Sequence, residues 1–499
     1  MLKKMIIEDK RIFIVLLLYS FLLIFFCSMM SPLYPYNDWS DINLYFNVGK
    51  AMFNGKVLYT EVFDHKGPFI FFIYGIGYLI SNTSFFGMFL IEAACWTLMI
   101  FTAYFTARLY LDKIYAFIVA LVFPVLLLSH TSEGGSAEEF IVIFQVISLY
   151  LFIRYFKEEN SSVHKPIYMM IHGLMCIMVM LIKINLVIFW FFPLLAIFIN
   201  LILKKEYKNL VHNIFAFLLG VTIVAFPFLI YFFANKALSE FWNIYINLNR
   251  SYAKIGSPME VLEGFFIRFY LRLRFETFEF LIILLGAVYF PIKYLRNKLG
   301  AVSIILSFVA LYMAIFITPG YVYYYSIPFY VFALPGCVVL CKFLNLSSNW
   351  RVYLICTLLV LIWGIKKHDF FSFTLNDLIN RTYKETIVEK ISDIIRREKN
   401  PTVINLGLDA NNGVFTRLNI VPSVKYFVTP NLRHDIYPEM RNEQTLYINN
   451  KEVEFVILPQ GALNFDYFLN LPALQNNYDL IDKFIDSESS AFYLYKRKD

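Results

Sequence analysis

The chain has 499 residues, of which 59% are hydrophobic, 19% are aromatic and only 16% are charged. This composition is too apolar for an ordinary soluble protein and predicts a protein embedded in membrane lipid. The net charge of +7 does not indicate nucleic-acid binding, because the basic residues stand in short clusters between apolar runs, as they do in the cytoplasmic loops of membrane proteins. We therefore expect membrane lipid, and no nucleic acid, around the chain.

The first apolar run covers residues 12–30 and follows a basic start. A basic start is also typical of a signal peptide, but this run is long enough to span a bilayer and lacks a small-residue cleavage site. We interpret it as an uncleaved first helix whose basic flank stays in the cytoplasm.

Further apolar runs of transmembrane length follow along the chain. Together with the first they predict about eleven transmembrane helices, at 12–30, 85–107, 114–130, 139–154, 166–183, 184–203, 213–234, 276–292, 300–318, 324–341 and 352–365. The segment 68–82 is ambiguous, because it is short for a span and contains Pro68, Gly75 and Gly77. If it does not span, or only re-enters, the Lys and Arg clusters of the loops become cytoplasmic, and the positive-inside rule favours that topology.

This topology puts the N-terminus in the cytoplasm and three long hydrophilic segments on the outer face: 31–67, 235–275 and the tail from about 366. The tail has a helical pattern at 385–397 and short apolar strands at 402–407, 454–458 and 491–495. We therefore expect an all-α membrane domain over 1–365, with interfacial helices in its first outer loop, and an extracytoplasmic α/β domain over 366–499. The tail has no glycine-rich phosphate loop or nucleophile elbow, which favours a docking or structural role for it.

The first outer segment concentrates charged side chains where the membrane surface should lie. They are Asp38, Asp41, Asp64, His65 and Lys66, and lipid packing explains carboxylates poorly at that depth. The apolar spacing that follows predicts an interfacial helix with Asp41 in its first turn. A simple helix-capping role for Asp41 is the alternative.

This segment resembles the first extracytoplasmic loop of the C-type glycosyltransferases, multispanning enzymes that include protein mannosyltransferases and the aminoarabinose transferase of lipid A. In that family an Asp follows the first helix, four residues before an aromatic residue, and a Lys-Pro-Pro-like element lies downstream. The match here is Asp41 with Tyr45, and then Lys66-Gly67-Pro68, in which Gly67 stands for the usual first Pro.

Two further motifs resemble the same family. HTSEGGSAEEF carries Glu133, Glu138 and Glu139, where the family has an acid facing the active site; stabilisation of a helix start by its dipole is the alternative for the last two. TPGYVYYYSIPFYV resembles a late motif and offers Tyr323 and Tyr325 for a sugar pocket. An interfacial aromatic belt is the alternative for the tyrosines.

Cationic side chains at the outer ends of helices complete the resemblance. Lys183 interrupts a long apolar stretch at a break where the family often has a Lys, so a contact with the donor phosphate is implied, and snorkelling is the alternative. The second outer segment supplies Arg250, Arg268 and Arg272, whose planar guanidinium groups suit a phosphate. Contact with lipid headgroups is the alternative for these arginines.

The resemblance implies an inverting sugar transfer from a polyprenyl (undecaprenyl) phosphate donor. Asp41 would deprotonate an acceptor hydroxyl, and cationic side chains would stabilise the leaving phosphate; Asp38 is the second catalytic candidate. We expect the acceptor to be a cell-envelope glycan such as a wall polysaccharide or a teichoic acid. A divalent metal ion stays open, with Asp38, Asp41, Asp64, His65 and Glu138 as possible ligands.

Two other classes of function stay open. A transporter or flippase of lipid-linked oligosaccharide would also need many helices and charges within the membrane, but such proteins usually show internal repeats and broken helices at the midplane. This sequence shows no repeat, and its acids gather in loops. A polymerase or ligase of surface polysaccharide would use a lipid-diphosphate donor, which the composition does not distinguish.

Overall fold

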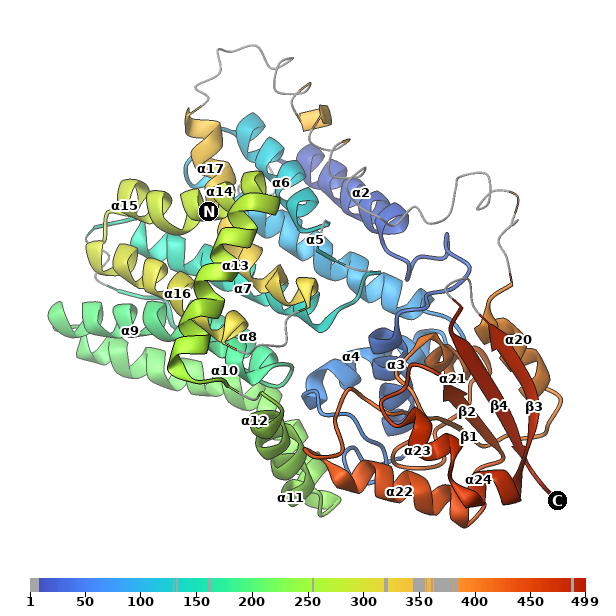
Figure 1. Cartoon of the computed structure of the whole chain (residues 1–499). Coiled ribbons are helices and arrows are strands. Elements are labelled where there is room, and N and C mark those ends of the chain that lie inside the picture. Colours follow the sequence, from blue (N-terminus) through green and yellow to red (C-terminus); the bar gives the residue numbers. More distant parts are fainter. Residues whose placement is uncertain are drawn as a thin grey trace. The chain divides into compact units, whose positions relative to one another are not determined.

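The computed structural model shows a mainly helical chain with a small sheet near the C-terminus (Figure 1). It describes residues 9–343 and 385–499, except 129, 132, 160–162, 254, 318–321 and 486–488, and between these ranges residues 355, 357–359, 362 and 380. The chain divides into two compact units. Unit 1 consists of Met1–Ser28, Ile91–Phe228 and Lys254–Ser372, and unit 2 consists of Met29–Leu90, Leu229–Ala253 and Phe373–Asp499.

Unit 1 contains most of the long apolar helices. Its helical elements are α2 (Lys10–Cys27), α5 (Phe86–Arg108, whose first turn is in unit 2), α6 (Lys113–Leu128), α7 (Ala137–Phe156), α8 (Pro166–Met180), η1 (Ile184–Val187), α9 (Ile188–Leu203), α10 (Tyr207–Ala234, whose last turns are in unit 2), α13 (Pro258–Phe275), α14 (Thr277–Leu284), η3 (Leu285–Tyr289), α15 (Phe290–Tyr294), α16 (Lys298–Phe316), η4 (Tyr323–Phe332) and α17 (Ala333–Phe343).

Eight helical stretches among the described residues are long and apolar enough to cross a membrane, and three shorter apolar helices, Pro68–Ile80, Lys113–Leu128 and Pro166–Met180, accompany them. Every predicted span from 12–30 to 324–341 coincides with a helix, whereas the last one, 352–365, lies mostly outside the described residues. The prediction of a multispanning helical protein is confirmed.

The long helices of unit 1 differ widely in burial. The apolar window of α7 is 83% buried and that of α10 only 6%. Helix α7 packs against α8 and η4 and is thus a core helix of the unit. Helix α10 presents large apolar side chains outward, as a lipid-facing helix does.

Unit 2 combines the first outer segment with the C-terminal region. Its helical elements are α3 (Ser40–Phe53), α4 (Pro68–Ile80), α11 (Leu238–Phe241), the π-helix η2 (Trp242–Leu248), α12 (Asn249–Tyr252), α20 (Ile387–Ile395), η5 (Ala410–Asn412), α21 (Gly413–Arg417), α22 (Pro438–Asn449), α23 (Phe465–Leu469) and α24 (Pro472–Asn477). The helix predicted after Asp41 is therefore present as α3. It differs from the expected one-sided helix, because every residue from Ile42 to Ala51 is buried.

Helices α3 and α4 approach each other closely at Gly49. A Cβ atom at this position would lie 2.6 Å from the carbonyl oxygen of Phe71 and 2.7 Å from the backbone nitrogen of Gly75. Only a glycine lets the two backbones meet in this way. The ambiguous segment 68–82 is thus a short helix packed against α3 (Figure 1).

The sheet of unit 2 has four strands in the order β1-β2-β4-β3. They are β1 (Val403–Asn405), β2 (Phe455–Pro459), β3 (Tyr478–Ile485) and β4 (Ala491–Arg497). Strands β1 and β2 are parallel, with Val403 opposite Phe455, whereas β4 is antiparallel to both of its neighbours. The prediction of an α/β region is confirmed, although β3 and α22 were not predicted. The predicted boundary at 365 lies outside the described residues.

Candidate active site

Asp41 lies in the first turn of α3 but does not cap it. The N-cap residue is Trp39, which makes no capping side-chain bond. The turn before the helix is held instead by Asn37, whose Oδ1 accepts from the Trp39 backbone N–H at 3.0 Å, and by Asn43, whose Nδ2 donates to the Asn37 carbonyl at 2.8 Å. Asp41 is half-buried and stands two residues after the N-cap position, so it is not the N-cap residue of α3.

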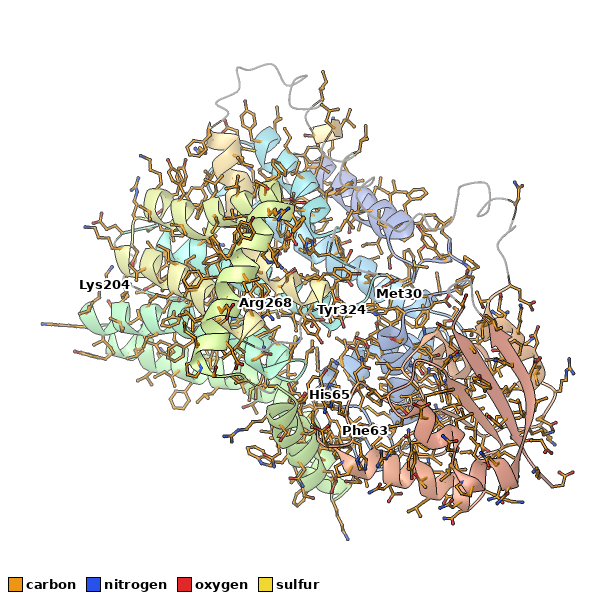
Figure 2. The ribbon with its side chains drawn as sticks, viewed as in Figure 1. Met30, Phe63, His65, Lys204, Arg268 and Tyr324 are labelled. Atoms are coloured by element: carbon orange, nitrogen blue, oxygen red, sulfur yellow. The ribbon has the colours of Figure 1, made fainter. Side chains whose placement is uncertain are left out.

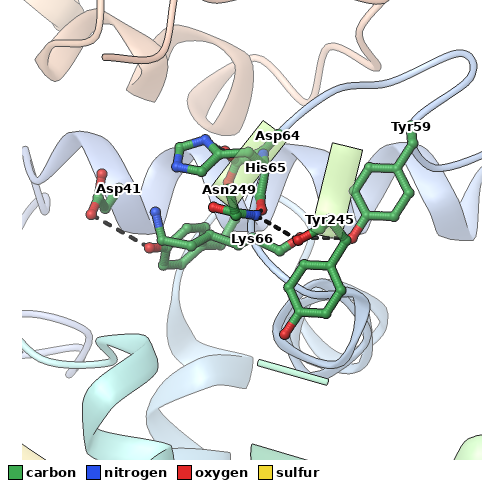
Figure 3. A network of polar contacts seen from close by, with 8 residues as sticks. Asp41, Tyr59, Asp64, His65, Lys66, Tyr245 and Asn249 are labelled. Carbon is green, nitrogen blue, oxygen red and sulfur yellow. Dashed lines mark hydrogen bonds and ion pairs between the residues drawn. The ribbon is translucent and has the colours of Figure 1, made fainter. Parts of the chain in front are cut away.

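The side chain of Tyr45 connects Asp41 with Lys66. The Tyr45 hydroxyl donates to Asp41 Oδ2 at 3.4 Å, and Lys66 Nζ lies 5.8 Å from the centroid of the Tyr45 ring (Figure 3). The ring itself is buried and makes edge contacts with Phe71 and Tyr74 of α4. A carboxylate and an ammonium group are thereby held around one rigid aromatic side chain.

The segment before α4 contains a fully buried carboxylate, that of Asp64. Its Oδ1 accepts from the His65 backbone N–H at 2.6 Å and lies 3.1 Å from His65 Nδ1. Burial alone raises the pKa of Asp64. The hydrogen bond and charge of His65, together with the charge of Lys66, lower this pKa by more than burial raises it, so the net pKa lies below its usual value. Asp64 is therefore an ionised group that is bonded to His65 and interacts with the charge of Lys66.

Two side chains anchor the backbone of this segment. Asn249 of α12 donates from Nδ2 to the His65 carbonyl at 2.6 Å, and the Tyr59 hydroxyl donates to the Lys66 carbonyl at 2.7 Å (Figure 3). Asn249 follows directly on the π-helix η2, a type of helix that is frequent at functional sites. The position of Lys66 is thus set on both sides of its peptide unit.

The remaining unit 2 candidates are surface residues. Asp38 is exposed just before α3, and Arg250 is exposed on α12, next to Asn249.

In unit 1 the structure brings together three candidates from distant segments. Lys183 Nζ lies 2.8 Å from Glu138 Oε1, and it also lies 3.7 Å from the centroid of the Tyr325 ring. Because Glu138 is buried, this ion pair replaces the snorkelling expected as the alternative for Lys183. Tyr323 is exposed, and its ring centroid lies 5.9 Å from that of Tyr324.

The neighbouring Glu139 has a structural role. Its carboxylate accepts from the Ser136 backbone N–H at 2.7 Å, while Ser136 Oγ accepts from the Glu139 backbone N–H at 3.1 Å. This reciprocal pair is a capping box that starts α7.

The arginines of α13 are also engaged within unit 1. Arg268, labelled in Figure 2, donates to the Phe316 carbonyl at 2.5 Å, and the buried Arg272 pairs with Glu276 at 2.6 Å. The Glu276 carboxylate also lies 3.3 Å from His130 Nε2 and accepts from the Tyr330 hydroxyl at 3.5 Å.

The sequence reasoning missed Glu276, His130 and Tyr330. The available signals were the four-residue spacing of Arg272 and Glu276, and the presence of His130 and Tyr330 inside the two quoted motifs. Arg272 is thus an arginine whose charge already has a carboxylate partner.

Within the ranges that the structure describes, no group of three or more His, Cys, Asp or Glu side chains could hold a metal ion. Asp64 and His65 offer adjacent ligand atoms, but the described residues add no third ligand to them.

Comparisons with known proteins find similarity in part of the sequence and in the fold. A family model described as dolichyl-phosphate-mannose-protein mannosyltransferase matches residues 65–232, which include His65, Lys66, Glu138 and Lys183. A search of curated proteins finds no match.

Solved structures extend the likeness over nearly the whole chain. ArnT from Cupriavidus metallidurans bound to undecaprenyl phosphate is 12% identical, with a TM-score of 0.58 over 98% of this chain and 98% of that chain. ArnT in the apo state is 12% identical, with a TM-score of 0.55 over 96% and 97%. The Archaeoglobus fulgidus oligosaccharyltransferase in complex with Zn and sulfate is 15% identical, with a TM-score of 0.47 over 97% of this chain and 72% of that chain.

The chain therefore resembles the C-type glycosyltransferases, in sequence over residues 65–232 and in fold over nearly its full length. It is a multi-pass membrane protein with the fold of ArnT.

Proposed function

We propose that this chain is a membrane glycosyltransferase that transfers a sugar from a polyprenyl (undecaprenyl) phosphate donor to a hydroxyl group of a cell-envelope acceptor. The observation that carries the proposal is the arrangement of Asp41 and Lys66 around Tyr45. These residues stand where the family has its Asp, its aromatic residue and its Lys element. The likeness to ArnT, whose structure contains undecaprenyl phosphate, supports a lipid-linked donor.

The reaction proposed is a single displacement with inversion at the anomeric carbon. Asp41 takes the proton of the acceptor hydroxyl, whose oxygen forms the new bond to the anomeric carbon as the bond to the phosphate oxygen breaks. Tyr45 orients the carboxylate by donating its hydroxyl hydrogen to it. Polyprenyl phosphate leaves with the bonding electron pair.

Lys66 is our first candidate for stabilising the charge that develops on the leaving phosphate. A preorganised cation at that position lowers the barrier, because it needs no rearrangement as the charge grows. Lys183 and Arg272, which lie beside Glu138 and Glu276, are the further candidates. The other substrate contacts that we propose are Asp38, Asp64, His65, Glu138, Arg250, Arg268, Tyr323 and Tyr325.

We further propose the topology and the acceptor class. The N-terminus lies in the cytoplasm and the C-terminal α/β region outside, so that the reaction takes place on the outer face of the membrane. The acceptor is a wall polysaccharide or a teichoic acid.

The test uses the purified protein in nanodiscs with a panel of radiolabelled undecaprenyl-phosphate sugars. We expect the wild type to consume one donor and release free lipid phosphate, and Asp41→Asn to be slower by about 10³-fold, because a general base is lost. Asp112→Asn, an exposed aspartate in another loop, is the matched control and should keep the wild-type rate. An Asp41→Asn variant as fast as the wild type would contradict the assignment of the base. If no donor is consumed while lipid-linked oligosaccharide crosses the bilayer, the protein is a flippase instead.

A further inference from the structure

One face of α3 carries three buried polar side chains. Asn43, Asn47 and Lys50 are separated by four and three residues, the spacing that places side chains on one face of a helix. They are 1%, 0% and 0% exposed. A helix that merely filled apolar space would not present an amide, an amide and an amine on the same buried face.

All three side chains bond to one short segment of the C-terminal region. Thr416 Oγ1 donates to Asn43 Oδ1 at 3.0 Å, and Asn47 Nδ2 donates to the Asn412 carbonyl and to Thr416 Oγ1, both at 3.1 Å. Lys50 Nζ donates to the Phe415 carbonyl at 2.6 Å. These bonds belong to unit 2 alone and join positions at least 365 residues apart in the sequence.

We call this contact of Asn43, Asn47 and Lys50 with residues 412–416 the polar seam. The seam is costly to bury, so its value lies in fixing one specific arrangement of α3. A buried amide or hydroxyl without a bond costs about 1–3 kcal/mol, and a buried ammonium group costs more. Burial accordingly lowers the pKa of Lys50 to about 7. A seam of this kind is satisfied in one rotational setting of α3 only, whereas an apolar seam would tolerate a turn of the helix about its axis.

The rotation of α3 decides where Asp41 points. Asp41 precedes Lys50 by nine residues, which at 3.6 residues per turn places the two side chains about 180° apart around the helix. Holding the Lys50 face against residues 412–416 therefore directs Asp41 to the opposite face, the face it shares with Tyr45. The seam thus controls the base without touching it.

A second contact with the C-terminal region holds the segment that leads to Lys66. Phe63, labelled in Figure 2, lies with its ring centroid 4.9 Å from that of Tyr426 and 5.3 Å from that of Tyr437, and its backbone N–H donates to the Lys425 carbonyl at 3.2 Å. The two tyrosine hydroxyls are bonded to each other at 2.7 Å. The C-terminal region thus holds the chain just before Asp64 through ring contacts and a backbone hydrogen bond.

We propose that the C-terminal region positions the catalytic loop of this enzyme, with Lys50 and Thr416 as positioning residues that set the direction of Asp41. Its catalytic consequence rests on the function proposed above. Its structural consequence does not, because the seam orders α3 whether or not the protein transfers a sugar.

The test compares Thr416→Val with Thr416→Ser in the full-length protein in nanodiscs. Valine keeps the shape of threonine but removes the hydroxyl that serves Asn43 and Asn47, whereas serine keeps that hydroxyl. Lys50→Met is the second variant, and Lys390→Met, at an exposed lysine of α20, is its control. Hydrogen–deuterium exchange of α3 is the first readout, with α16 as the internal reference. The kcat and KM for donor consumption are the second.

For Thr416→Val and Lys50→Met we expect exchange in α3 to become about tenfold faster and kcat to fall about tenfold, with an unchanged KM for the donor. Thr416→Ser and Lys390→Met should behave as the wild type does. Wild-type exchange and wild-type kcat in a folded Thr416→Val protein would overturn the positioning role. If the wild type consumes no donor, the proposed function fails, and the exchange of α3 still decides whether the seam orders the loop.

Discussion

Helices α3 and α13 lie in two segments that were predicted to be outer segments with functional residues, yet the two helices are built in opposite ways. Helix α3 buries ten consecutive residues, from Ile42 to Ala51. Helix α13 buries only Arg272 and exposes Met259 and Phe266 to 74% and 70%.

The difference shows which candidate residues the protein holds in place by its own packing. Helix α3 is enclosed by α4, η5 and α21 of its own unit, so the direction of Asp41 is a property of the folded chain. The large apolar side chains of α13 need a cover that the described residues do not supply, and for an interfacial helix that cover is lipid. Asp41 is thus placed by protein packing, whereas the arginines of α13 stand on a helix whose apolar side chains the described residues leave exposed.

The largest effect of a substitution is expected at Lys66, a cation of unit 2, the unit that contains α3. Lys66→Met should lower kcat/KM for the donor by about 100-fold, because the charge that stabilises the leaving phosphate is lost. Steady-state consumption of labelled donor measures the effect. Lys56→Met, in the same segment, should change it less than about twofold. If the Lys66→Met variant has the wild-type kcat/KM, Lys66 does not contact the phosphate, and Lys183 or the arginines of α13 become the candidates.

An intermediate effect is expected at Glu276, which neutralises the one buried residue of α13. Glu276→Gln removes the carboxylate charge that lies 2.6 Å from the buried Arg272 guanidinium, so the free energy of unfolding should fall by roughly 2 kcal/mol. Thermal unfolding in detergent measures the loss. Glu263→Gln, at an exposed position of the same helix, should leave the midpoint unchanged. Equal midpoints for both variants would mean that the Arg272 pair does not anchor α13.

The smallest effect is expected from the pH dependence of Lys50. The pKa of Lys50 is about 7 in the folded protein against an ordinary value of 10.5, so above pH 7 the unfolded chain binds the proton that the folded protein has lost. Stability should therefore rise with pH, by about 1 kcal/mol between pH 6 and pH 8, whereas below pH 6 this lysine is protonated in both states and contributes no slope. Lys50→Met should lose this rise and Lys390→Met should keep it. A rise of the same size in all three proteins would assign it to other groups.

Much of the fold could be predicted from the sequence, because an apolar run long enough to span a bilayer has few alternatives to a helix in lipid. The helices at 12–30, 139–154 and 300–318 are cases of this kind. Strand β3 was missed because it lies at the edge of the sheet with most of its side chains exposed. Its sequence, YDLIDKFI, therefore lacks the alternation that reveals a half-buried strand.

The site was predictable where its contacts are local and unpredictable where they are not. Asp41 and Tyr45 are four residues apart on one helix, so their contact follows from helix geometry. The pairing of Lys183 with Glu138 joins residues 45 apart in the sequence, and no spacing rule foretells it. Lys50 was overlooked because its partner is a backbone carbonyl, that of Phe415. Every residue type has such a carbonyl, so the sequence does not indicate which residue accepts the bond. The catalytic roles of all these residues stay predictions.

The bonds between α3 and residues 412–416 also set the order in which the protein matures. A ribosome adds roughly 5 to 20 residues per second, and Lys50 is separated from its partner at Phe415 by 365 residues. Roughly 20 to 70 seconds therefore pass between the synthesis of Lys50 and that of its acceptor. During that time the polar face of α3 is unmatched, so the newly made protein completes this contact only after the apolar helices up to α17 have been made.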